Sequence, residues 1–186
     1  AKMNPLVLRV CNSQKLLDQF VEGNKLLDSV QKGLSDYLET KRLAFSRFFF
    51  LSNDELIEIL SETKDPLNVQ PFVKKCFEAV AELDFDSDLH IRGMKSIEGE
   101  EVCFVKDIET AGEANGVERW LLKVEEIMQK SLHHITEDAL VDYKAKERSQ
   151  WVLDWPGQIV IAISQVYWTR QVVDALQSSG GLGQYA

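Results

Sequence analysis

The chain has 186 residues, of which 45% are hydrophobic and 27% are charged, the composition of a soluble globular protein of one or two domains. Its formal net charge of −9 and pI near 4.9 argue against a nucleic-acid partner, because phosphate binding needs clustered lysine and arginine. The most apolar run, 159–163, is far shorter than the roughly 20 residues that span a membrane, so no membrane partner is expected.

The three cysteines, Cys11, Cys76 and Cys103, are odd in number and far apart, so they predict no disulfide framework and indicate a reducing compartment. Cys76 has no base or metal ligand near it in sequence and is expected to be a small buried hydrophobic residue. The chain lacks an initiator methionine and ends in SSGGLGQYA, from which we expect a piece of a longer protein.

From Gln14 to Thr40, apolar residues recur at helical spacing on one face, which predicts one long helix. Gly23 and Gly33 each cost about 1 kcal/mol relative to alanine inside a helix, so packing must hold the helix or a bend must use one of them. The residues of this stripe are Leu16, Phe20, Leu27, Val30, Leu34, Tyr37 and Leu38.

A sharp corner is predicted at 45–60, FSRFFFLSNDELIEIL, where four phenylalanines precede a strong helix start. Ser52 and Glu55 have the spacing of a capping box, in which each side chain bonds the backbone N–H of the other residue. Leu51 and Leu56 occupy the two positions of a hydrophobic staple, which fixes the angle at which the chain enters the helix.

The helix that starts at Asn53 should end near Thr63, because Asp65 precedes a proline and is pushed out of the α region. We expect Asn68 to cap a second helix, with Pro71 in its first turn. The buried stripe of this second helix is predicted to be Val69, Phe72, Val73, Cys76, Phe77, Val80 and Leu83.

The segment 87–110 lacks a helical stripe and places Leu89 and Ile91, and later Val102 and Phe104, at a spacing of two, which predicts a β-hairpin. Its turn should lie at Glu98, Gly99 and Glu100, where glycine supplies a positive φ.

A further helix is predicted from a cap at Asn115 through Trp120 to Leu132, ending at His133 and His134, where cations suit the C-terminal dipole. Thr136 would start another helix, which runs toward a charged linker at 144–150.

The last predicted helix runs through Pro156 to Leu176, with Asp154 as its cap, and is apolar on several faces, which is typical of a central helix. The β-branched residues 159–161 also allow a buried strand, but the length of the pattern favours a helix. Trp155, Tyr167 and Trp168 are interpreted as packing anchors rather than as a ligand cage.

No catalytic, cofactor-binding or metal-binding residues are predicted. The acidic cluster Glu98, Glu100 and Glu101 is typical of a solvated turn, and His90 with scattered cysteines does not have the spacing of a zinc site. The glycine-rich end lacks the lysine and the serine or threonine of a phosphate-binding loop.

Four stretches, KRLAFSRFFFLSNDELIEIL, SIEGEEVCF, VERWLLKVEEIM and WVLDWPGQIVIAISQVYW, resemble in their order the linker region of dynein heavy chains. Ser46 stands where family members usually have proline. The WPGQ pattern resembles axonemal more than cytoplasmic dyneins. The resemblance covers almost the whole chain and implies a mainly α fold, an elongated helical bundle rod with helical parts at 1–86 and 111–186 around a β-hairpin insertion at 87–110.

The resemblance also implies a function. In that family the linker is a mechanical lever lying across a ring of AAA+ modules, and ATP and Mg²⁺ are bound in the ring rather than in this segment. The expected partners are the ring of the same heavy chain and, through the parent chain, microtubules and other dynein subunits, in the axoneme of a cilium or flagellum or alternatively in the cytoplasm. A passive helical scaffold that binds partner proteins fits the residue patterns equally well, and an enzyme fits them least.

Overall fold

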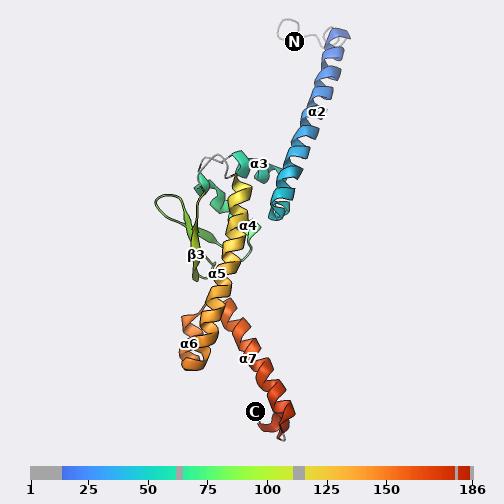
Figure 1. The fold of residues 1–186 in the computed structure, drawn as a ribbon. Helices are drawn as coiled ribbons and strands as arrows, with labels where there is room; N and C mark the ends of the chain where they lie inside the picture. Colours follow the sequence, from blue (N-terminus) through green and yellow to red (C-terminus); the bar gives the residue numbers. More distant parts are fainter. Residues whose placement is uncertain (1–13, 62–64, 111–115, 179, 185–186) are drawn as a thin grey trace. The chain divides into compact units, whose positions relative to one another are not determined.

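The computed structural model describes residues 14–61, 65–110, 116–178 and 180–184. The chain divides into two compact units, Ala1–Ile57 and Glu58–Ala186. Its described part is mainly helical, with one small antiparallel sheet, which confirms the predicted fold class (Figure 1). No helix among the described residues is both long and apolar enough to cross a membrane.

The first unit is dominated by α2 (Gln14–Ala44), a continuous helix of 31 residues that confirms the long helix predicted around Gly23 and Gly33. Its apolar stripe is largely exposed, and Leu38 is the buried residue of the helix. Phe20 and Leu27, for example, are 64% and 66% exposed. The periodicity therefore predicted the helix correctly. The apolar face of α2 that it also predicted is not covered by other described residues.

After α2 the chain forms the 3₁₀ helix η1 (Ser46–Phe50) and then begins α3 (Asn53–Ser61). The aromatic cluster is divided, because Phe45 and Phe48 are fully buried while Phe49 and Phe50 are more than half exposed. The rings of Phe45 and Phe48 meet edge to face, with centroids 5.0 Å apart. The predicted end of α3 near Thr63 lies outside the described residues.

The second unit continues with the 3₁₀ helix η2 (Pro66–Val69) and the short α4 (Gln70–Cys76). Pro71 lies in the first turn of α4 as predicted, but the cap residues are different. The N-cap residue of α4 is Val69, and Asp65 caps η2, where its carboxylate accepts from the Leu67 N–H at 3.0 Å. Cys76 is buried, as expected, while Cys11 lies outside the described residues.

The prediction that this second helix extends to Leu83 is wrong. The helix ends at Cys76, and Leu83 lies in a strand, β1 (Glu82–Phe85). Val80 and Leu83 are buried as the stripe required, so burial was predicted correctly and the backbone conformation was not. A short apolar run has the same composition in a helix and in a strand, and tertiary pairing decides between them.

The sheet has the order β1-β2-β3, with β2 (Ile91–Lys95) and β3 (Glu101–Ile108) forming the predicted hairpin. Both strand pairs are antiparallel, and Met94 is paired with Leu83 on one side and with Val102 on the other. Gly99 has a φ of 86° in the turn, the conformation for which glycine was expected. A side chain at Gly93 would meet the Val102 carbonyl oxygen at 2.7 Å, so the close strand approach requires glycine there.

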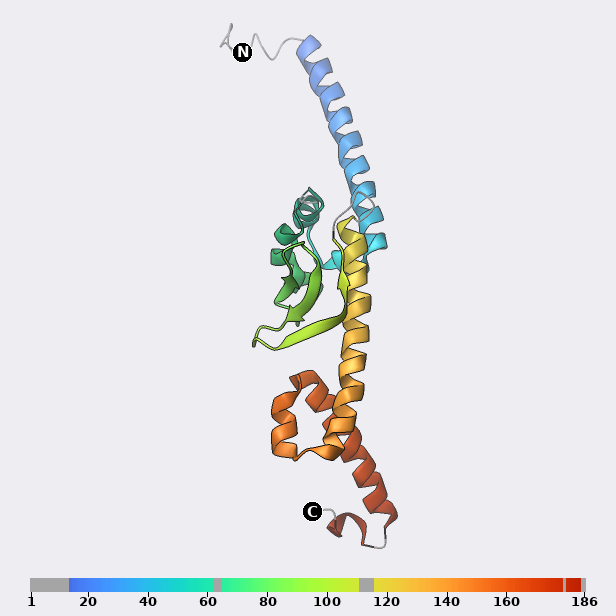
Figure 2. The same ribbon diagram turned by 60° about the vertical axis from the view of Figure 1, so that its left-hand side comes forward.

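A single long helix, α5 (Val117–Ala145), covers the sheet and runs on past it (Figure 2). The expected helix end at His133 and His134 and the restart at Thr136 are therefore wrong. These residues lie inside one helix, and each histidine is paired with a carboxylate four residues later. The helix starts after Gly116, and the predicted cap at Asn115 lies outside the described residues.

Two helices pack against the C-terminal half of α5, namely α6 (Arg148–Asp154) and α7 (Gly157–Gln177), before η3 (Gly181–Gln184) ends the described chain. Most of the predicted charged linker is thus helical. Asp154 does not cap α7, because it ends α6 and pairs with Lys146, and Pro156 is the N-cap residue instead.

The expectation that α7 is central is not met among the described residues. Ile159 and Ile163 are buried, whereas Ile161 and Trp168 are 61% and 59% exposed. The buried cluster at this end of the unit consists of Ala139, Trp151, Ile159 and Ile163.

Candidate functional site

The corner between η1 and α3 contains the predicted capping box. The Ser52 N–H donates to Glu55 Oε2 at 2.8 Å, and the Glu55 N–H donates to Ser52 Oγ at 3.3 Å. The Ser52 hydroxyl also donates to Glu55 Oε2 at 2.9 Å. Leu51 and Leu56 are both buried, at 3% and 0% exposed, as the two residues of a staple would be. The start of α3 is therefore stabilised by reciprocal hydrogen bonds and by the burial of the two leucines.

Arg42 adds a bond to this corner that the sequence analysis did not anticipate. Its guanidinium donates to the Leu51 carbonyl oxygen at 3.2 Å and to Asn53 Oδ1 at 2.8 Å. The end of α2 is thus tied to the residues on both sides of Ser52. The sequence did not indicate that Arg42 would reach across the turn, because its two partners lie nine and eleven residues later in the chain.

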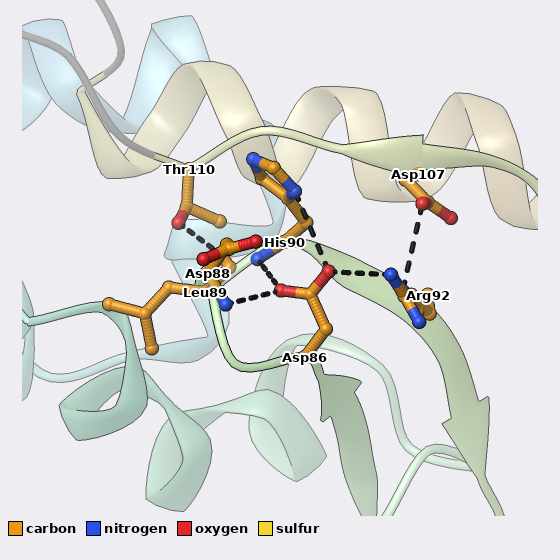
Figure 3. Close-up of polar contacts among 7 residues, drawn as sticks. All are labelled: Asp86, Asp88, Leu89, His90, Arg92, Asp107 and Thr110. Carbon is orange, nitrogen blue, oxygen red and sulfur yellow. Dashed lines mark hydrogen bonds and ion pairs between the residues drawn. The ribbon is translucent and has the colours of Figure 1, made fainter.

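A second rigid point, also missed from sequence, is the loop between β1 and β2, which is organised by Asp86 (Figure 3). Asp86 Oδ1 accepts from the backbone N–H groups of Asp88 at 2.9 Å and His90 at 2.8 Å. Asp86 Oδ2 lies 3.0 Å from Arg92 Nη2 and 3.6 Å from His90 Nδ1. The side chain is 7% exposed, so it works as the buried centre of the loop.

The surroundings of Asp86 lower the pKa of its carboxyl group below the ordinary value of 3.8. The largest cause is the hydrogen bond from the backbone N–H of His90, with the Asp88 N–H and the nearby Arg92 acting in the same direction and burial opposing them. The loop is thus built on a carboxylate that remains ionised.

The same loop is tied to the end of β3. Leu89 has a φ of 62°, a strained conformation for a residue with a side chain, and its carbonyl oxygen accepts from the Thr110 hydroxyl at 2.7 Å. Thr110 is 6% exposed. Arg92 Nε also lies 3.7 Å from Asp107 Oδ2 on β3 (Figure 3). The β1–β2 loop is therefore connected to both β2 and β3.

Both edges of the sheet are closed by side chains from helices. At the β1 edge, the Gln70 side-chain amide donates to the Leu83 carbonyl oxygen at 2.6 Å and accepts from the Leu83 N–H at 3.0 Å. At the β3 edge, Val105 donates its N–H to Ser131 Oγ at 3.0 Å, and Ser131 is fully buried in α5. The small sheet is therefore fixed to α4 and α5 by directional bonds as well as by packing.

The predicted packing anchors are found in different environments. Trp120 is buried at 2% exposed in α5, whereas Trp168 is mostly exposed on α7. Trp155 packs against the cluster around Trp151, and its buried indole N–H has no hydrogen-bond partner among the described residues. Pro156 forms the junction between α6 and α7.

The hairpin carboxylates do not converge on a common point. Glu101 pairs with Lys95 at 2.7 Å, and Glu100 accepts from the Gly157 N–H at 2.8 Å. In the part of the chain that is described, no three or more His, Cys, Asp or Glu residues are grouped so that they could hold a metal ion. The polar residues described above fix loops, helix starts and sheet edges. The candidate site is therefore a set of structural connections rather than a catalytic or binding centre.

Comparisons with known proteins agree with the resemblance seen in the sequence. Residues 1–139 match the family described as "Dynein heavy chain, N-terminal region 2". The chain belongs to the dynein heavy chain family. Dynein axonemal heavy chain 1 of Mus musculus is 54% identical over 175 residues, which is 94% of this chain and 4% of that protein. Dynein axonemal heavy chain 3 of Homo sapiens is 49% identical over 170 residues, which is 91% of this chain and 4% of that protein.

A third relative, dynein axonemal heavy chain 12 of Rattus norvegicus, is 46% identical over 183 residues, which is 98% of this chain and 6% of that protein. These relatives are all axonemal dynein heavy chains, which confirms the resemblance to the axonemal type. The chain spans 4% to 6% of their length, so it corresponds to a small part of the N-terminal region of a dynein heavy chain.

Proposed function

We propose that this segment is part of the linker of a dynein motor, a mechanical lever that relays ATP-driven changes in the AAA+ ring into the power stroke. The parent chain would bind ATP and Mg²⁺ in the ring and would act on microtubules together with other dynein subunits in the axoneme. The family membership supplies the motor context for this proposal. The segment itself would bind no nucleotide.

The observation that carries the proposal is the rigid corner at Ser52. A lever transmits force only if its corners resist bending, and here a reciprocal capping box and the Arg42 guanidinium hold the chain at both sides of the turn. Ser52, Asn53 and Asp54 are exposed, so the bonds here serve the backbone angle and not the filling of a core.

A passive helical scaffold is the alternative. The exposed apolar stripe of α2 and the exposed Trp168 of α7 favour it, because such surfaces are suited to binding partner helices. The two functions differ in what a loosened corner would do. A scaffold tolerates a softer angle as long as its surfaces remain folded, whereas a lever loses output.

The test is the double change Ser52→Ala and Glu55→Ala in the parent motor. Removing the box should cost about 1 to 2 kcal/mol locally, enough to loosen an angle without unfolding the chain. We expect ATP turnover to remain close to wild type while microtubule gliding slows, both measured on one preparation whose fold is checked by circular dichroism.

The matched control is Gln14→Ala with Asp18→Ala, which removes an exposed hydrogen bond of 2.9 Å within α2 without touching a corner. Gliding should then be unchanged. If the Ser52 and Glu55 variant loses gliding and ATP turnover in proportion, or loses neither, the mechanical role of this corner is rejected.

A further inference from the structure

A cavity of about 340 Å³ lies in the second unit between the β2–β3 hairpin, α5 and the start of α7. The hairpin and the start of α7 lie on the same side of α5 (Figure 2). Beside the cavity they are joined by the hydrogen bond from the Gly157 N–H to Glu100 Oε1 at 2.8 Å. We call this cavity the hairpin pocket.

The inner surface of the hairpin pocket is apolar. Val80, Met94 and Val102 line it from the sheet side and are buried. Helix α5 contributes Met128 and Leu132, which lie four residues apart and therefore face the same side of the helix. An aliphatic side chain that entered this pocket would exchange water for contacts with apolar atoms, which is favourable.

Two features of this inner surface limit what it would bind. The volume of the pocket is at the lower end of the roughly 300 to 1,000 Å³ found for ligand sites, so it suits one aliphatic side chain rather than a large cofactor. Met94 and Met128 have unbranched, flexible side chains, which adapt to the shape of an apolar guest. The pocket is therefore suited to a leucine or a methionine.

The polar residues of the lining give the pocket an acidic character. Glu98 and Glu100 contribute to the lining from the hairpin turn, and both are exposed. Glu98 makes no hydrogen bond or ion pair among the described residues, and Glu100 bonds an uncharged backbone N–H. Lys95, the basic residue of the lining, lies 2.7 Å from Glu101 and is thus already paired. A cation beside the pocket would therefore be attracted.

Exposed surface at the edge of the pocket favours a stretch of polypeptide over a free small molecule. Ile97 belongs to the lining and is 59% exposed, so apolar surface continues outside the pocket. Gln158, at the start of α7, is exposed and offers an amide donor and an amide acceptor. A peptide that runs past the pocket would cover Ile97 and bond Gln158 through its backbone, whereas a small amine would leave both in water.

We propose that the hairpin pocket is a docking site for a segment of a partner protein in which a leucine or methionine lies next to a lysine or arginine. The aliphatic side chain enters the pocket between Met94 and Met128, and the cation pairs with Glu98. The net charge of −9 on the chain attracts a basic partner from a distance. This docking site does not depend on the proposed lever function.

The test is a titration of the 186-residue chain, isotope-labelled in its methionine methyl groups, with the peptide Gly-Ser-Arg-Leu-Arg-Ser-Gly. The methyl resonances of Met94 and Met128 should shift and saturate, because both side chains line the pocket. Gly-Ser-Arg-Ser-Arg-Ser-Gly lacks the aliphatic side chain, and Gly-Ser-Glu-Leu-Glu-Ser-Gly reverses the charge. Each should bind at least about tenfold more weakly, since one loses the apolar burial and the other places carboxylates beside carboxylates.

Two variants locate the binding in the pocket. Glu98→Gln should weaken the Arg-Leu-Arg peptide about two- to fivefold, the range of an exposed ion pair, while Glu82→Gln, exposed on β1 and outside the lining, should not. Ala79→Phe places a ring in the pocket from an exposed position and should weaken binding at least about tenfold. Its control is Ala145→Phe, exposed at the end of α5 and outside the lining, which should leave the affinity unchanged. Circular dichroism verifies the fold of each variant.

Several outcomes would overturn the docking site. One is the absence of any shift of Met94 and Met128 at the highest soluble peptide concentration, and another is equal affinity for the three peptides. Equal affinity of the wild type and Ala79→Phe would show that the peptide binds elsewhere. Shifts of the same methyl groups that follow the protein concentration without peptide would assign the pocket to a second copy of this chain instead. None of these measurements involves ATP turnover or gliding, so their failure is distinct from failure of the lever.

Discussion

Replacing Gln70 by alanine should destabilise the second unit, because one side chain supplies both hydrogen bonds at the free edge of β1. The Gln70 amide donates to the Leu83 carbonyl oxygen at 2.6 Å and accepts from the Leu83 N–H at 3.0 Å. Leu83 is 3% exposed, so water cannot easily replace the lost partner. The alanine variant leaves a donor and an acceptor unpaired beside a buried leucine.

The size of the effect follows from the two bonds. Each intramolecular hydrogen bond contributes about 0.5 to 1.5 kcal/mol net, so the free energy of unfolding should fall by about 1 to 3 kcal/mol. The difference in helix propensity between glutamine and alanine is small and favours alanine slightly, so it does not change the sign. The change in surface exposed on unfolding is minor, and the denaturant slope should stay constant.

The assay is urea unfolding followed by tryptophan fluorescence, which reports on the second unit because all four tryptophans lie there. Gln70→Glu is the informative companion: it keeps the shape and one acceptor but turns a carboxylate oxygen toward the Leu83 carbonyl, so it should be at least as destabilising as alanine. Gln165→Ala, on the exposed surface of α7, should change stability by less than about 0.5 kcal/mol. A Gln70→Ala variant as stable as Gln165→Ala, or a tolerated Gln70→Glu, would refute the reasoning.

Two further predictions concern acid stability and nucleotide binding. Because the folded pKa of Asp86 is lowered, its carboxylate stabilises the fold above the unfolded pKa of about 4, and this contribution is lost as the pH falls from there through the folded pKa. The difference in the free energy of unfolding between the wild type and Asp86→Asn, measured by urea titration, should therefore be constant near neutral pH and shrink below about pH 4. A difference that stays the same at acid pH would contradict this role. The 186-residue chain should bind no ATP, since its sequence has no phosphate-binding loop, and calorimetry that detects one site of micromolar affinity would contradict that expectation.

Local patterns in the sequence predicted those parts of the structure whose partners are close in the chain. The capping box of Ser52 and Glu55 spans three residues, and the hairpin turn depends on the positive φ of Gly99, so both could be predicted. The long helix α2 follows from its periodicity alone. In each case the interactions that decide the conformation lie within a few residues of one another.

The contacts of the candidate site that join residues distant in the chain could not be predicted in this way. Strand β1 exists where a helix was expected because Leu83 pairs with Met94 and with the Gln70 side chain, thirteen residues earlier. The bond from Glu100 to Gly157 joins residues 57 positions apart, and nothing in the sequence around either one indicates the other.

The sequence alone determined that the chain is mainly helical, that α3 starts at the Ser52 capping box, that a hairpin turn lies at Gly99, and which family the chain resembles. The tertiary structure decided which apolar faces are covered, since the same periodicity gave a buried Trp120 on α5 and an exposed Phe20 on α2. It also decided that α5 runs unbroken through His133, because packing on the sheet at one end and on α6 and α7 at the other outweighs weak local signals to stop. The physical reason is that periodicity reports only that a face is apolar, while burial and the angles between elements depend on partners distant in the chain.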